Sequence, residues 1–189
     1  MKARDFHPRH LDIGLFAEQA ATLEGDEPLT QFERLVTCLH EGSQGSTTEA
    51  VHWHAEGEVR RAEGGRKEIW LHLHAQVAAP LECQRCLEAV AEPLEVDRSF
   101  LFAATEEQAA QWDGEHEEDV LVISHHFNLF ALIEDELLME VPLVPRHEIC
   151  PVPVVLSTGD IDTPADGAPP EREHPFAALA ALKKTKSSA

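Results

Sequence analysis

Cationic residues are scarce in this sequence of 189 residues, which has 15 Lys and Arg against 35 Asp and Glu and a formal net charge of -20. Each contact with a phosphate group needs a cation, so this balance disfavours broad binding to a nucleic-acid backbone. The same balance favours a basic protein partner. The segment from Ser99 to Pro145 is the extreme case, with eleven Asp or Glu and no Lys or Arg.

Long apolar runs are also missing. No window approaches the roughly eighteen apolar residues of a membrane span, and the first residues lack an apolar run of signal-peptide length. Four cysteines without framework spacing indicate a reducing compartment rather than a disulfide scaffold. We therefore expect a cytoplasmic protein that makes no contact with a membrane.

The motifs of the common enzyme classes are absent. The sequence contains no nucleophile elbow, no phosphate-binding glycine loop and no pattern of paired catalytic carboxylates. We therefore expect neither catalysis nor a small-molecule substrate.

Helical periodicity is present in two segments. Residues 29–39 carry apolar side chains at helical spacing behind Pro28, and Cys38 falls near that apolar stripe, which predicts a packed thiol. Residues 128–140 form the second predicted helix, with Asn128 as the N-cap. A short helix is predicted at residues 106–112.

Alternating patterns indicate strands. Residues 51–56 and 69–77 alternate around a Gly-Gly pair and predict a β-hairpin. A turn centred near Glu63 would place His52 opposite His74 and His54 opposite His72, on the less apolar face. These four imidazoles could bind zinc, nickel or copper, or the face could simply meet solvent or a partner.

Further strands are predicted on both sides of this hairpin. They cover residues 11–16, residues 87–105, where Pro93 suggests an edge or a bulge, and residues 118–124. The predicted fold class is α+β, an antiparallel sheet of about four or five strands flanked by the two main helices. One domain spans residues 1–156, a disordered linker residues 157–173, and a short helix with a basic end residues 174–189.

Cys83 and Cys86 form a Cys-x-x-Cys at the tip between two antiparallel strands. A redox couple is disfavoured, because the neighbouring Glu82 and Glu88 raise a thiol pKa and only Arg85 opposes them. A zinc knuckle fits better, with His147 and Cys150 at a ligand-like spacing after the second helix. The alternative is an unmetallated turn and an unrelated cysteine.

Three stretches occur in a recognisable order: "LECQRCLEAV", "LIEDELLMEVPLVPRH" and "HPFAALAALKK". From about residue 30 to residue 184 the chain resembles the YceD family, the large ribosomal RNA subunit accumulation proteins. The resemblance implies a role in the synthesis, processing or stability of 23S ribosomal RNA, with no established catalytic residues. Members in other lineages have more cysteines after the helix, where this chain has only His147 and Cys150.

Two groups of residues are candidates for binding a large-subunit precursor particle, a basic ribosomal protein or ribosomal RNA. One is the cation cluster at the hairpin tip, and the other is the apolar, basic C-terminal segment; both could also be solvated surface. They comprise Arg60, Arg61, Arg66 and Lys67, and Phe176, Leu179, Leu182, Lys183, Lys184 and Lys186. The rival function is that of a zinc-binding or redox protein built on the Cys-x-x-Cys.

Overall fold

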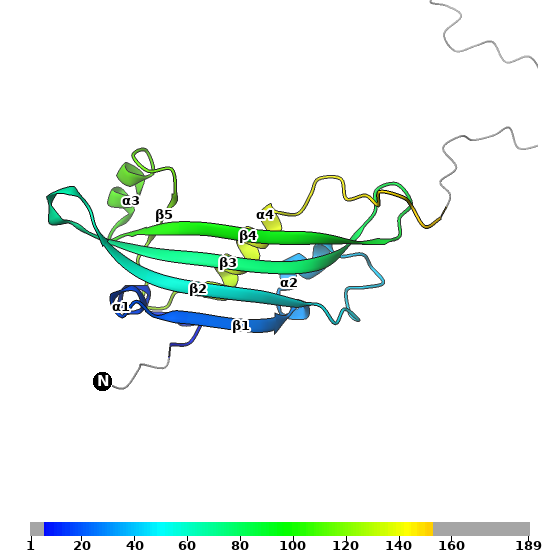
Figure 1. Ribbon diagram of the computed structural model, residues 1–189, viewed down its shortest axis with the longest axis horizontal. Helices are drawn as coiled ribbons and strands as arrows, with labels where there is room; N and C mark the ends of the chain where they lie inside the picture. Colours follow the sequence, from blue (N-terminus) through cyan, green and yellow to red (C-terminus); the bar gives the residue numbers. More distant parts are fainter. Residues whose placement is uncertain (1–5, 153–189) are drawn as a thin grey trace, which may run out of the picture. The chain divides into compact units, whose positions relative to one another are not determined.

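A computed structural model describes residues 6–152 of the chain (Figure 1). The predicted linker at 157–173 and the predicted helix at 174–189 lie outside these residues. The elements, in chain order, are α1 (Ile13–Glu18), β1 (Thr22–Pro28), the 3-10 turn η1 (Leu29–Gln31), α2 (Glu33–Cys38), β2 (Ala50–Arg61), the 3-10 turn η2 (Glu63–Gly65), β3 (Lys67–Glu82), β4 (Ala89–Ala103), α3 (Glu106–Trp112), β5 (Asp119–Val122) and α4 (Leu129–Met139).

The five strands form one sheet in the order β1-β2-β3-β4-β5, which confirms the α+β class. The first four strands are antiparallel neighbours, whereas β5 pairs parallel to β4, so the sheet is mixed rather than wholly antiparallel. The parallel pairing follows from the connection, because α3 carries the chain back along the sheet before β5 begins. Pro93 lies on a part of β4 that β5 does not reach, as an edge proline should.

The β2–β3 hairpin exists, but its predicted register is wrong by two residues. His54 lies opposite His74, while His52 faces Gln76 and His72 faces Glu56. The turn is centred on Gly64, where Gly64 and Gly65 have φ angles of 82° and 80° that suit glycine. Both registers pair residues whose numbers have an even sum, so the assignment of side chains to the two faces is unchanged.

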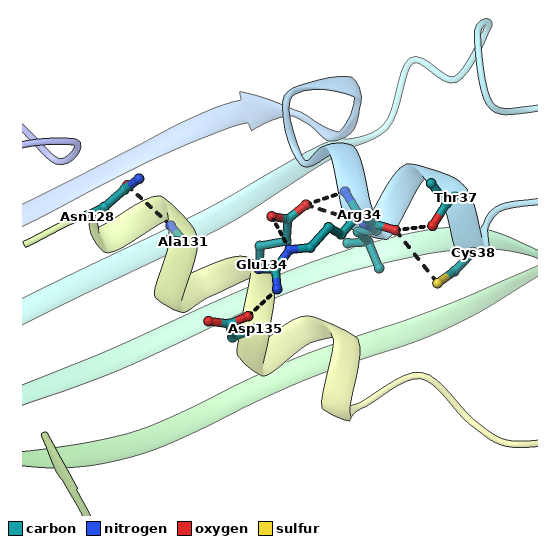
Figure 2. A network of polar contacts seen from close by, with 8 residues as sticks. Arg34, Thr37, Cys38, Asn128, Ala131, Glu134 and Asp135 are labelled. Carbon is teal, nitrogen blue, oxygen red and sulfur yellow. Dashed lines mark hydrogen bonds and ion pairs between the residues drawn. The ribbon is translucent and has the colours of Figure 1, made fainter.

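Side chains alternate across the sheet, and one face is buried by helices. Figures 1 and 2 show α2 and α4 on the same face of the sheet. Trp53 of β2 packs against Phe130 of α4 with ring centroids 5.6 Å apart, and Phe130 also meets Phe32. The main core lies between these helices and the strands.

The N-terminal region differs from the prediction. Residues 11–16 were predicted as a strand, but they enter the helix α1, because Asp12 caps it by accepting the Leu15 N–H at 3.1 Å. Strand β1 follows and was not predicted. Gly57 of β2 permits α1 to pack closely, since a Cβ there would lie 2.7 Å from Phe16.

The predicted helix at 29–39 is divided into η1 and α2 by Phe32, which has a non-helical backbone. Cys38 ends α2 and is exposed, so its predicted packing in the core is wrong. Leu35 and Leu39 are buried against the core, whereas the Cys38 thiol is exposed to solvent. The second helix is confirmed as α4, and the Asn128 side chain accepts the Ala131 N–H at 3.3 Å (Figure 2).

The other face of the sheet carries a smaller apolar cluster at the end covered by α3. Its buried members are Trp70, Leu101, Ala103, Ala109 and Trp112. Over the rest of this face, polar and charged side chains of β1 to β4 are exposed or half-buried. None of the helices in the described residues is long and apolar enough to cross a membrane.

Candidate metal centre

Two segments far apart in the sequence bring four potential metal ligands together. Cys83 and Cys86 lie in the turn between β3 and β4, and His147 and Cys150 lie in the segment that follows α4. One ligand atom from each residue lies within 4.8 Å of all the others. The structure therefore places the predicted ligand set in one group close enough to bind a metal ion.

The turn that carries the first pair is closed by its own backbone. The Cys83 N–H donates to the Glu88 carbonyl at 2.9 Å, and the Leu87 N–H donates to the Cys83 carbonyl at 2.8 Å. Leu87 has a φ of 64°, the left-handed conformation that tight turns require and that leucine seldom adopts. After this residue the chain enters β4.

The second pair is held against this turn mainly by Arg85. Its guanidinium donates to the carbonyls of His147 at 2.6 Å and Glu148 at 3.2 Å, and its Nε lies 3.0 Å from the Cys150 sulfur. The Gln84 N–H also donates to the Pro145 carbonyl at 2.9 Å. From the sequence, Arg85 was predicted only to be a charge near the thiols. Its position inside the Cys-x-x-Cys was the only signal of these contacts.

The spacing of the ligand atoms suits a tetrahedral ion. In a zinc site with ordinary bond lengths, two sulfurs lie about 3.8 Å apart, and a sulfur and a nitrogen about 3.6 Å apart. The Cys83 and Cys150 sulfurs are 4.0 Å apart, and the Cys86 sulfur lies 3.4 Å from His147 Nδ1. The four ligand atoms need only small shifts to surround one ion.

The orientation of His147 also fits metal binding. Its Nε2 lies 3.1 Å from the Ala89 carbonyl oxygen, and because a carbonyl only accepts, Nε2 carries the hydrogen. The unprotonated Nδ1 is then the nitrogen that faces the cysteines. A backbone carbonyl that fixes the tautomer in this way is a usual partner of a metal-binding histidine.

The thiols differ in their electrostatic environment. Burial acts to raise the pKa of the Cys83 thiol, but backbone N–H groups, first that of His147 and then that of Cys86, lower this pKa to about 5. Burial and the neighbouring thiols raise the pKa of Cys86 to about 11. The expectation that acidic neighbours raise the thiol pKa is therefore wrong for Cys83, because its sulfur accepts from the backbone of His147 and then from that of the turn.

The cations predicted to bind a partner at the hairpin tip mostly have partners within the chain. Arg60 pairs with Glu58 at 2.8 Å and lies over the Trp70 ring, Arg66 pairs with Glu68 at 3.2 Å, and Lys67 lies 3.8 Å from Glu18. Arg61 is exposed and makes no ion pair within residues 6–152. Phe176, Leu179, Leu182, Lys183, Lys184 and Lys186 lie outside the described residues.

Three of the four histidines of the second candidate metal locus have carboxylate partners. His52 Nδ1 lies 2.5 Å from Asp26, His54 lies 3.7 Å from Glu24, and His72 lies 2.9 Å from Glu58. Within the part of the chain that the structure describes, the cysteine–histidine group is the one set of three or more ligands close enough to share an ion.

The structure is therefore an α+β fold in which a helix-covered five-stranded sheet carries a Cys3His group at its end. The sequence matches, over residues 71–183, the family described as Large ribosomal RNA subunit accumulation protein YceD. This match covers more than half of the chain and both halves of the ligand group, and the chain belongs to that family.

A curated relative from Haemophilus influenzae (strain ATCC 51907 / DSM 11121 / KW20 / Rd) is also described as Large ribosomal RNA subunit accumulation protein YceD. It is 32% identical over 111 residues, which are 58% of this chain and 62% of the relative. The alignment thus spans less than two thirds of the relative's length. No solved structure matches the chain.

Proposed function

We propose that this chain is a ribosome biogenesis factor that supports the synthesis, processing or stability of 23S ribosomal RNA. The observation that carries the proposal is the family match over residues 71–183, which includes the Cys-x-x-Cys turn, α4 and the segment with His147 and Cys150. The proposed action is binding rather than catalysis.

The charge of the chain supports a basic partner in the large-subunit precursor particle. A net charge of -20 attracts the Lys- and Arg-rich chains typical of nucleic-acid-binding proteins and repels the phosphate backbone itself. A basic ribosomal protein is therefore a better direct partner than bare RNA. Contact with RNA would fall to the few cations that remain, such as Arg61 at the hairpin tip and Lys183, Lys184 and Lys186.

Deletion of the gene in the parent organism tests this role. We expect a lower ratio of mature 23S to 16S RNA and fewer complete large subunits, both restored by a plasmid copy of the chain. Unchanged ratios together with unchanged subunit profiles would refute the proposal.

We further propose that Cys83, Cys86, His147 and Cys150 hold one structural zinc ion. Three thiolates and an imidazole are a usual donor set for zinc, and four protein ligands leave no open position for a substrate. Zinc would join the β3–β4 turn to the segment after α4, which Arg85 already holds in place. A closed site of this kind stabilises a fold and does not catalyse a reaction.

Metal analysis of protein purified without a His-tag or a chelating column tests the zinc site. We expect about one zinc per chain, lost in the Cys83→Ser/Cys86→Ser variant and retained in Cys38→Ser, whose thiol is exposed and outside the group. Because structural zinc contributes on the order of 10 kcal/mol in small domains, the double variant should also melt several degrees lower. Wild-type protein free of zinc after such a purification would refute this site.

A zinc-binding or redox protein without a ribosomal role is the second candidate function, favoured by the same four ligands. Metal content measured beside co-sedimentation with ribosomal precursors separates the two. Zinc together with co-sedimentation supports the biogenesis role, whereas bound metal without any co-sedimentation supports the second candidate.

A further inference from the structure

Within residues 6–152, no helix covers one face of the sheet along most of β1 to β4. Helices α1, α2 and α4 all contribute to the main core on the opposite face, and α3 covers only the end marked by Trp70 and Trp112. Between these limits most outward-facing side chains are exposed, among them Asp26, His52, Gln76 and Glu95, whereas the rings of His54, His72 and His74 are half-buried. A sheet face left open in this way is a surface available to a partner.

Two adjoining depressions lie on this open face and share His52. One has a volume of about 410 Å³ and is lined by side chains such as Glu24, Asp26 and His74. The other has a volume of about 300 Å³ and includes Gln76, Ala78, Pro93 and Glu95. Together they cross the sheet from β1 to β4.

The size of this crossing suits an extended peptide. Neighbouring strands lie about 4.8 Å apart, so three strand spacings cover about 14 Å, a distance that four or so residues of an extended chain span. Ala78 and Pro93 give the second depression an apolar floor. The aliphatic stems of lysine and arginine can pack on such a floor while their charged ends reach polar groups.

The charges around the depressions identify the kind of peptide. Glu24 and Asp26 line one depression, Glu49 and Glu95 line the other, and no Lys or Arg lines either. Ring nitrogens of His52, His54 and His74 offer further hydrogen-bonding groups beside these carboxylates. The surface therefore repels phosphate and attracts ammonium and guanidinium groups.

We propose that this open face is the docking surface for an extended, Lys- and Arg-rich segment of a protein partner. The identification of that partner as a large-subunit component rests on the proposed function. The docking surface itself rests on the uncovered strands, the two shared depressions and the complementary charge.

Binding of a short fluorescent peptide rich in lysine and arginine to the full chain tests this surface. The same peptide with glutamine at each cationic position is the probe control. The test variant neutralises the carboxylates that line the two depressions, by Glu24→Gln, Asp26→Asn, Glu49→Gln and Glu95→Gln. We expect the peptide to bind the unchanged chain at about 0.1 M salt, where the Debye length is about 10 Å, and the variant to bind it at least about tenfold more weakly, since four ion-pairing groups are lost.

A matched control separates this surface from general charge attraction. Glu41→Gln, Asp113→Asn, Glu117→Gln and Glu118→Gln remove the same formal charge from exposed positions that line neither depression. We expect this variant to lose less than about threefold in affinity, because exposed charges beyond a Debye length are screened. Equal losses in the two variants would overturn the proposal.

A second variant tests the surface even if the fourfold variant fails to fold. Gln76→Lys adds one cation beside His52 at an exposed strand position, where it disturbs no packed side chain. It should weaken peptide binding at an unchanged melting temperature. Unaltered affinity in this variant would contradict the assigned surface.

Other occupants give distinct results. If removal of residues 159–189 tightened peptide binding, the chain's own basic end would be the occupant of the face. If an RNA oligomer displaced the peptide from the face, the occupant would be an anion and not a cationic segment. Either result overturns the proposal. The assay contains no ribosomal component, so an unchanged 23S ratio in the deletion strain would refute the proposed function while leaving this surface intact.

Discussion

Glu134 of α4 links the two helices that cover the main core. Its carboxylate accepts the backbone N–H groups of Arg34 at 2.7 Å and Leu35 at 3.3 Å, and it also meets the Arg34 side chain at 3.1 Å (Figure 2). Helix α2 lacks a capping side chain of its own, because its N-cap residue is Phe32. Glu134 therefore caps α2 from a distance of 100 residues in the sequence.

The effect of Glu134→Ala follows from this role. The Glu134 side chain is only 13% exposed, so water does not replace it freely at the two N–H groups. Loss of an N-cap costs about 1–2 kcal/mol of folding free energy. For a chain of this size each kcal/mol lowers the melting temperature by about 2–4 °C, so we expect a decrease of about 2–8 °C.

Asp135 provides the matched control, since it contacts the same arginine. Its ion pair with Arg34 at 2.6 Å is exposed on both sides, and solvent screens it. Thermal unfolding followed by circular dichroism should show a change of about a degree or less for Asp135→Ala. An intermediate effect is expected for Arg34→Met, which keeps the capped N–H groups. Equal decreases for Glu134→Ala and Asp135→Ala would refute the capping argument.

Two further changes test other parts of the chain. Gly57→Ala places a Cβ 2.7 Å from Phe16 and 2.8 Å from the Ala17 backbone, so it should destabilise the fold by about 1–3 kcal/mol in denaturant titrations. Gly45→Ala, which meets nothing within 4 Å, should not, and similar midpoints for the two would contradict the packing of α1. Truncation after Thr158 should leave the melting temperature within about a degree but abolish binding to large-subunit precursors. A destabilised truncated chain that still binds would make the tail part of the core.

The strands with alternating patterns were predictable from the sequence. Along most of β2 and β3 every second residue is buried by α1, α2 and α4. This burial requires an apolar residue at every second position, which is the pattern seen in the sequence. The register depended on one turn, where Gly64 and Gly65 adopt positive φ angles. Nothing in the sequence decided between neighbouring turn centres, because a shift of two residues preserves the face of each side chain.

The N-terminal region was not predictable in the same way. Strand β1 forms one edge of the sheet and buries little, so its sequence "TLEGDEP" lacks an apolar period. Helix α1 has only six residues, too few for helical periodicity to differ from a short strand. Both elements depend on tertiary contacts, such as the close approach of α1 to Gly57.

The four ligands were predictable from the sequence, but the residues that hold them in place were not. Cys83, Cys86, His147 and Cys150 stood out because metal-binding residue types recurred at short spacings. Two groups orient these ligands: the Ala89 carbonyl, which contacts the His147 ring, and the Arg85 guanidinium, which contacts the Cys150 sulfur. Every residue has a backbone carbonyl, so the sequence does not show which carbonyl contacts His147. No sequence pattern indicates which groups an arginine inside a turn will contact.

The separation of the two apolar clusters has a spectroscopic consequence. The chain contains three tryptophans and no tyrosine, so its ultraviolet-excited emission comes from the indoles. Trp53 lies in the main core, whereas Trp70 and Trp112 lie in the cluster under α3 on the other face. Emission from a Trp53→Phe chain thus follows the α3 end of the sheet, and emission from a Trp70→Phe/Trp112→Phe chain follows the main core. Opening of one layer before the other becomes visible as two curves that do not coincide.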